Sequence, residues 1–256
     1  MSTALNSSLK PVVQLQEPHV VGQRLMNELK VLSGGAVQKG LEDLARVFEG
    51  ETGHPVTLKF ATAPVLRSTV EKREGLFDIV IAPLSLVESF TKSGRVVASS
   101  QAVVGSVEAG VVVREGVGEP DISSVEALKK EILASESLVF NEGSSGTYVE
   151  EMLQKLGVAV EAKAKTTRLP NAEAVMMHLA YSKTAHEIGF GQITAIRLYA
   201  GRGVKLVGPL PLEIGNTTTY AAAALAGTRV PELAECFIRF LIAPAAREIL
   251  RATGVE

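Results

Sequence analysis

The chain has 256 residues, of which 46% are hydrophobic and 21% charged, and it contains no tryptophan. This composition is typical of a globular protein with a substantial core, and the length suits one large domain or two of about a hundred residues each. A formal net charge of −2 at pH 7 argues against a surface that binds nucleic acid or a basic patch that binds a membrane. Any site for an anion must therefore be made locally, from helix ends and hydroxyl groups.

The single cysteine, the lengths of the apolar runs and the first residues indicate the compartment in which the protein works. Cys236 lies in an apolar helical pattern, so we interpret it as a buried core residue, and no disulfide can form within the chain. No apolar run approaches the length of about 18 residues that a spanning helix needs, so we predict no membrane insertion. Residues 1–26 contain no apolar run like that of a secretory signal. We expect them to be a disordered extension, or Met26 to be the true start. The chain as written is then cytoplasmic, and a different precursor would make it periplasmic.

Residues 29–48 read as a strand, a tight turn and a helix. Residues 29–32 suit a short buried strand, Ser33, Gly34 and Gly35 form the turn, and apolar residues recur at helical spacing as far as Phe48. Such a turn leaves the first N–H groups of the helix without internal partners, at the positive end of the helix dipole. We expect this turn to bind an anion.

The same order returns in the second half of the chain. Residues 137–140 predict a strand and residues 147–156 a helix, which stops at Gly157. Between them lies the turn Gly143, Ser144, Ser145 and Gly146, and Thr147 opens the helix. The two turns, one in each half of the chain, could face each other.

A third strand-to-helix turn follows the alternating strand at residues 56–60. Thr62 is placed to cap a helix that runs from Val65, and Pro64 suits its first turn. Arg67 lies one turn into that helix. We interpret Arg67 as part of a solvated face, with the alternative that its guanidinium reaches a carboxylate.

The first part of the chain alternates strands and helices with short connections. Residues 77–81 form an apolar run typical of a strand covered on both faces, and residues 85–90 form a short helix. This order predicts a mostly parallel sheet with right-handed crossovers. In open sheets of this kind ligands bind at the carboxyl ends of the strands, where these turns lie.

Two long extended runs, residues 101–114 and 217–225, are interpreted as crossings between two lobes. Residues 27–106 with 218–256 then form the first lobe, and residues 107–217 form a second lobe inserted into it. The predicted fold class is α/β, with two Rossmann-like lobes joined by two extended hinge crossings. A hinge of this kind makes a cleft that closes on its ligand.

The remaining elements complete both lobes. Residues 123–126 read as a capping box that opens the helix of residues 128–133. Further elements are a helix at residues 171–181, strands at residues 188–190 and 204–207, and helices opened by Pro231 and Pro244. His178 and His186 have no Asp, Glu or Cys at metal-ligand spacing, so we predict no metal site.

Four sequence segments, taken in chain order, resemble segments of the type 2 periplasmic solute-binding proteins, especially of their molybdate-binding branch. The segments are KVLSGGAVQKGLEDLARVFEGETG, FATAPVLRSTVEKREGLFDIVIAP, EGSSGTYVEEMLQKLG and EIGFGQITA. The resemblance runs from about Lys30 to the C-terminus. It implies a two-lobed fold that clamps a small anion, with an ABC-transporter permease as partner and no cofactor.

Carried over position by position, the family's ligand pocket falls on Ala36, Thr62 or Ala63, Ser145, Ala172 and Phe190. The molybdate-binding branch usually has hydroxyl groups at the first two places and a tyrosine at the last, so these donors are missing or shifted here. Each unmade hydrogen bond to a desolvated anion costs roughly 1–3 kcal/mol. The resemblance therefore favours a larger, flatter anion such as a di- or tricarboxylate, framed by Ser33, Thr62, Ser144, Ser145 and Thr147.

The resemblance also includes aconitate isomerase, so a second hypothesis is an isomerase that shifts a double bond within an unsaturated tricarboxylate. A 1,3-proton shift needs a base and an anion cradle but no cofactor. Glu142, just before the second turn, is the best-placed carboxylate for that base, and the alternative is a surface charge on a loop. A third hypothesis, the ligand-binding half of a regulator, lacks any helix-turn-helix or basic patch.

Overall fold

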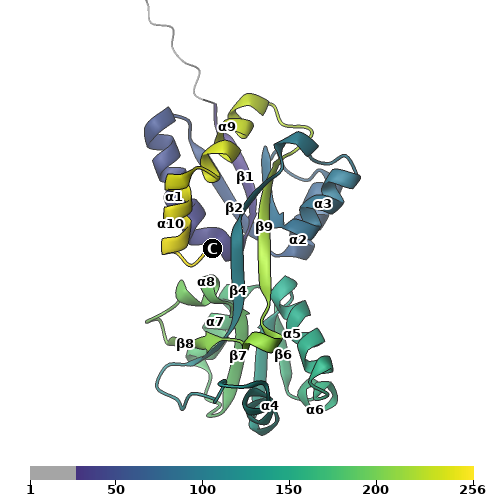
Figure 1. Ribbon diagram of the computed structural model, residues 1–256, viewed down its shortest axis with the longest axis vertical. Coiled ribbons are helices and arrows are strands. Elements are labelled where there is room, and N and C mark those ends of the chain that lie inside the picture. Colours follow the sequence, from purple (N-terminus) through teal and green to yellow (C-terminus); the bar gives the residue numbers. More distant parts are fainter. Residues whose placement is uncertain (1–26) are drawn as a thin grey trace, which may run out of the picture.

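The computed structural model describes residues 27–256, so the extension predicted for residues 1–26 lies outside the described residues. Figure 1 shows two α/β lobes, one above the other, connected by two long neighbouring strands. These strands are β4 (Ala102–Arg114) and β9 (Thr217–Ala224), which pair antiparallel. The predicted fold class of two lobes and two extended crossings is confirmed.

The first lobe is built on parallel strands. β1 (Leu29–Gly34) pairs parallel with β2 (Val56–Ala61) and with β3 (Ile79–Pro83), and β3 pairs antiparallel with β9. The sheet order is β2-β1-β3-β9-β4. β3 is buried throughout, as its apolar run predicts, because helices cover both faces of the sheet.

Helices cover the two faces of the first lobe in separate groups (Figure 1). One group packs on one face: η1 (Gly35–Val37), α1 (Gln38–Thr52), α9 (Pro231–Leu241) and α10 (Pro244–Ala252). On the other face lie α2 (Ala63–Lys72) and α3 (Leu84–Lys92), with the short η2 (Ala98–Ser100) before β4. Cys236 on α9 is only partly buried, and it packs against the hydrophobic core beneath α1, α9 and α10.

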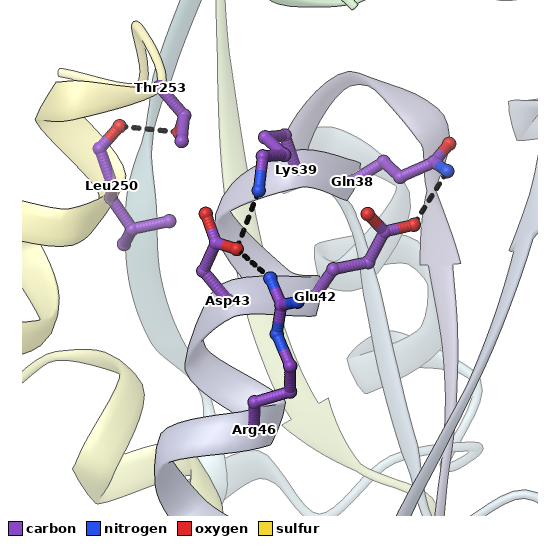
Figure 2. A network of polar contacts seen from close by, with 7 residues as sticks. All are labelled: Gln38, Lys39, Glu42, Asp43, Arg46, Leu250 and Thr253. Carbon is purple, nitrogen blue, oxygen red and sulfur yellow. Dashed lines mark hydrogen bonds and ion pairs between the residues drawn. The ribbon is translucent and has the colours of Figure 1, made fainter.

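Figure 2 shows the polar contacts within α1 and, beside them, the hydrogen bond from the hydroxyl of Thr253 to the carbonyl of Leu250 at the end of α10. Asp43 pairs with Lys39 at 2.6 Å and with Arg46, and Gln38 donates to Glu42 at 2.8 Å. The Lys39 hydrogen bond and ion pair lower the pKa of Asp43. On the inner side Gly40 lies so close to α10 that a β-carbon there would sit 2.7 Å from Leu250.

The second lobe continues the sheet in the order β4-β7-β5-β6, and β8 pairs with the far end of β4. Its strands are β5 (Ser137–Asn141), β6 (Thr166–Leu169), β7 (Glu187–Gln192) and β8 (Val204–Pro209). Its helices are α4 (Val125–Ala134), α5 (Ser144–Lys155), α6 (Ala159–Lys163), α7 (Ala172–Tyr181), α8 (Ile193–Arg197) and η3 (Leu212–Ile214). β5 pairs parallel with β6 and β7.

Several predicted boundaries are corrected. α5 begins at Ser144, not Thr147, so the Gly-Ser-Ser-Gly run is the first turn of the helix and not a loop before it. α2 begins at Ala63, two residues before Val65, and Ser124 is the residue that caps α4. β6, α6 and α8 were not predicted, because each is short and has too few residues for a periodic pattern.

No helix in residues 27–256 combines the length and the hydropathy needed to cross a bilayer.

Candidate anion-binding cleft

A cavity of about 510 Å³ lies between the lobes. The first lobe contributes the carboxyl ends of β1, β2 and β3 and the starts of the helices that follow β1 and β2. The second lobe contributes the carboxyl ends of β5 and β7, the starts of α5 and α7, and Ala195 of α8. Among the lining residues with polar groups are Thr62, Asn141, Ser144, Ser145, Gln192 and Tyr220. The cleft thus forms where the carboxyl ends of parallel strands from both lobes meet.

Two helix starts of the first lobe face this cavity without a capping side chain. Gly34 precedes η1, which continues directly into α1, and Thr62 precedes α2. Thr62 stands at the N-cap position as predicted, but its side chain makes no capping hydrogen bond. The first N–H groups of both helices therefore have no side-chain partner to displace when an anion approaches.

Two helix starts of the second lobe face the same cavity. Gly143 precedes α5, again with no capping side chain. Asn171 does cap α7, since its Oδ1 accepts from the N–H of Ala174 at 2.8 Å. The dipoles of all four helices point their positive ends toward one volume, which favours an anion there.

Asn141, the last residue of β5, shapes the turn into α5. Its Oδ1 accepts from the N–H of Gly143 at 2.7 Å, and its Nδ2 donates to the hydroxyl of Ser145 at 3.1 Å. A β-carbon at Gly146 would overlap with the carbonyl oxygen of Asn141. Glycine is therefore required at residue 146 for the helix to start directly on the strand end.

A buried tyrosine from the hinge strand joins the two lobes at the cavity. Tyr220 on β9 is 3% exposed, and its hydroxyl lies 3.0 Å from Nε2 and 3.1 Å from Oε1 of Gln192 on β7. Burial raises the pKa of Tyr220, although hydrogen bonds with Gln192 and Ser144 oppose the shift. The phenol therefore stays neutral and can donate a hydrogen bond.

The residues that line the cavity include no Lys, Arg or His in the described part of the chain. Glu173, in the first turn of α7, is the one carboxylic acid among them, and it lies near Tyr199. Burial raises the pKa of Tyr199, and the negative charge of Glu173 raises it further, whereas Arg202 lowers it. Attraction for an anion must come from helix dipoles and neutral donors.

The cavity brings together eight of the residues predicted for the site, from both lobes. These are Gly34, Gly35, Ala36, Thr62, Ala63, Ser144, Ser145 and Ala172. The two turns singled out in the sequence thus share one cavity.

The other predicted residues lie outside the lining. Ser33 is fully buried, and its hydroxyl donates to the carbonyl of Gly34. Arg67 is on the exposed face of α2, paired with Glu71 at 3.4 Å, and Glu142 is exposed. Phe190 packs in the second-lobe core.

Two further predicted residues lie just behind the second turn. Gly146 is buried against Asn141, and Thr147 lines a neighbouring groove beside β9. That groove meets the main cavity at Ser144.

Sequence reasoning missed several polar residues that line the cavity, namely Gln38, Asn141, Asn171, Gln192, Tyr199 and Tyr220. Asn141 and Gln192 each end a strand, so the rule that ligands bind at carboxyl ends of strands could have found them. Tyr220 had no such signal, because it lies within the hinge strand.

No group of three or more His, Cys, Asp or Glu side chains is placed to hold a metal ion within residues 27–256.

The described residues have the type 2 periplasmic-binding-protein fold, which the similar solved structures share. Residues 29–256 match the model of the bacterial extracellular solute-binding protein family, and the chain belongs to this family.

Individual relatives differ in what their names say they bind or convert. The chain is 26% identical over 235 residues to an aconitate isomerase of Pseudomonas sp, covering 89% of this chain and 87% of the relative. The sulfate-binding protein of Mycobacterium tuberculosis H37Rv has a TM-score of 0.73 at 13% identity, covering 90% of this chain and 86% of that one. The periplasmic molybdate-binding protein of Azotobacter vinelandii has a TM-score of 0.70 at 18% identity, covering 89% and 98%. These structures share the fold with this chain.

Proposed function

We propose that this protein binds a small organic polyanion, of the di- or tricarboxylate class, between its two lobes. The observation that carries the proposal is the convergence of four helix N-termini, three of them without capping side chains, on one cavity that spans both lobes. Backbone N–H groups at helix starts are natural partners for carboxylate oxygens. Because both lobes supply them, the ligand favours the closed arrangement.

The size of the cavity supports an organic anion over a tetrahedral oxyanion. Its volume of about 510 Å³ falls within the range of roughly 300–1,000 Å³ typical of pockets for organic ligands. A tetrahedral oxyanion occupies only a few times the volume of one water molecule, about 30 Å³. A tetrahedral oxyanion would leave many of the donors at the helix starts of the two lobes, such as those at Ala36 and Ser145, without a partner.

A thermal-shift panel tests this proposal. Citrate, cis-aconitate and trans-aconitate should raise the melting temperature more than molybdate or sulfate does. A ligand at a hundredfold excess over its Kd stabilises the folded state by about 2.7 kcal/mol. Ser145→Ala should reduce the shift, and Ser123→Ala, on an exposed loop, should not. Stabilisation by molybdate alone, or by none of the five anions, would overturn the proposal.

As a receptor, the protein would hand its ligand to an ABC-transporter permease. Membership of the solute-binding family supports this partner. So does the fold shared with a substrate-binding domain from Clostridium difficile that is assigned to a molybdenum ABC transporter. That structure has a TM-score of 0.64 at 13% identity, and the match covers 90% of this chain and 98% of that one. The receptor hypothesis requires a location outside the inner membrane, so we propose a periplasmic site of action for it.

An isomerase of an unsaturated tricarboxylate is the second candidate, and the likeness to aconitate isomerase over most of both chains favours it. In a 1,3-proton shift a base removes a proton from the carbon beside a carboxylate, the electron pair moves through the double bond, and a proton returns at the far carbon. Helix N-termini would stabilise the negative charge of the intermediate. The cavity offers Glu173 as base, while Glu142 stays the candidate from the sequence.

An absorbance assay with trans-aconitate separates the two candidates. Turnover by the wild type that Glu173→Gln abolishes would assign the base to Glu173. Loss only in Glu142→Gln would assign it to Glu142. Binding of trans-aconitate without any turnover would leave the receptor function alone.

A further inference from the structure

Tyr220 occupies the place where the hinge strand leaves the first lobe. The antiparallel pairing of β3 with β9 ends at Pro83 opposite Tyr220. The pairing of β4 with β9 changes register between Val103 and Gly105, and Gly105 is the partner of Tyr220. The extra residue of this irregularity, Val104, lies on β4, so Tyr220 keeps the alternation of β9. Its side chain lies on the same face as Ala222 and lines the cavity between the lobes.

The turn at Gly34, which follows β1, holds the Tyr220 ring in place. A β-carbon at Gly34 would sit 2.8 Å from Cε1 of the ring, so the ring packs directly on the backbone of the turn. Tyr220 therefore touches the turn of the first lobe with its ring and Gln192 of the second lobe with its hydroxyl.

The hydrogen bond to Gln192 prepares the tyrosine to donate. Nε2 of Gln192 donates to the phenol oxygen at 3.0 Å, and the phenol proton points to Oε1 of Gln192 at 3.1 Å. A ligand carboxylate is a stronger acceptor than an amide oxygen, so it can take over this second hydrogen bond while Nε2 keeps the first. Hydrogen bonds in such a chain strengthen one another. Ser144, at the N-terminus of α5, also hydrogen-bonds with Tyr220 and lines the same cavity.

We infer that Tyr220 and Gln192 form a carboxylate-recognition pair, in which Gln192 orients the Tyr220 hydroxyl and this hydroxyl donates to a carboxylate oxygen of the bound ligand. The inference rests on the proposed function. Because the pair bridges the two lobes at the hinge strand, ligand recognition depends on the position of one lobe relative to the other. It also supplies the side-chain donor that Phe190, in the second-lobe core, does not supply.

The first test removes only the hydroxyl. Tyr220→Phe keeps the ring on Gly34, and calorimetric titration with citrate and trans-aconitate should show about ten- to a hundredfold weaker binding, the range for a hydrogen bond to a charged group. Tyr181→Phe makes the same change at a tyrosine that is 77% exposed, and it should bind as the wild type does.

The second test separates recognition from structure. Gln192→Glu can still hydrogen-bond with the Tyr220 hydroxyl, but it adds a negative charge beside the ligand. The ratio of its Kd to that of the wild type should exceed about tenfold at pH 8 and fall as pH 5 is approached, because protonation removes the charge. If residue 192 lay away from the bound ligand, the ratio would not change with pH, and the pair would not be part of the recognition site.

The outcomes distinguish a failure of this inference from a failure of the proposed function on which it rests. If the wild type binds none of the carboxylates, the proposed function fails and the inference fails with it. If the wild type binds and Tyr220→Phe binds equally well, only the inference is overturned. If Tyr220→Phe does not fold, the pH dependence of Gln192→Glu decides.

Discussion

The ring of Tyr220 packs on the backbone of Gly34, which joins the hinge strand to the first turn of the anion cleft. Gly34 has an ordinary extended backbone, with φ of −66° and ψ of 142°. Glycine is thus needed at residue 34 for space and not for its torsion angles. The contact means that the position of the first turn and the position of the tyrosine cannot change independently.

Gly34→Ala should therefore damage the cleft. The new methyl group must push the Tyr220 ring away, and overpacking of this kind costs about 1–3 kcal/mol of stability. The displaced ring also moves its hydroxyl from Gln192, so calorimetry should show weaker binding of citrate. Unchanged binding would show that the contact does not position the tyrosine.

Gly146→Ala should be more damaging, because its methyl group would overlap with the Asn141 carbonyl, a backbone atom that cannot rotate away. A loss of more than about 4 kcal/mol is expected, which denaturant unfolding measures. Gly50→Ala is the matched control. Its methyl group meets nothing within 4 Å on the exposed side of α1, so it should stabilise the protein by up to about 1 kcal/mol.

Glu187 makes the stability of the second lobe depend on pH. Burial raises its pKa, but hydrogen bonds with Ser182, Ser137 and His178 outweigh burial and hold the pKa below its usual range. Its contribution is then fully present above the unfolded-state pKa of about 4.3 and is lost as the pH falls through the folded-state pKa.

Glu187→Gln should accordingly flatten the acid limb of the stability profile. Near pH 7 the variant should be less stable by about 1–3 kcal/mol, because the partly buried hydrogen bond to His178, 3.0 Å long, loses its charged partner. The gap should narrow below pH 4. Glu51→Gln, on the exposed end of α1, serves as control, and a parallel shift of both profiles would contradict the assignment.

Asp43 anchors the ion pairs of Figure 2. Asp43→Asn removes the charged partner of Lys39 and Arg46 on α1. Each helical pair of this kind contributes about 0.3–0.5 kcal/mol, so thermal unfolding should show a loss below about 1 kcal/mol. Since the pKa of Asp43 is lowered, this loss should be present at neutral pH and vanish in acid. Raised salt should reduce it as well.

Much of the fold could be predicted because its longer elements carry clear periodic patterns. The buried run of β3 and the amphipathic α1 both appear where the spacing of apolar residues placed them. The division into lobes at residues 27–106 with 218–256 and 107–217 remains a prediction. Short elements such as β6 and α8 escaped, because four or five residues cannot establish a period.

The cleft could be predicted only where backbone chemistry defines it. Gly34 and Ser145 follow from the strand-turn-helix pattern, and both line the cavity. Side chains that reach the cavity from elsewhere in the fold have no local pattern. Tyr220 reaches the cavity because the hinge strand β9 passes beside Gly34, and Gln192 reaches it through the packing of the two lobes.

The most direct test of the account is a crystal structure of the protein with trans-aconitate or citrate. We expect the ligand between the lobes, with carboxylate oxygens on the N–H groups of Ala36 and Ser145 and one oxygen at the Tyr220 hydroxyl. A ligand bound outside this cavity, or held by one lobe alone, would contradict the account.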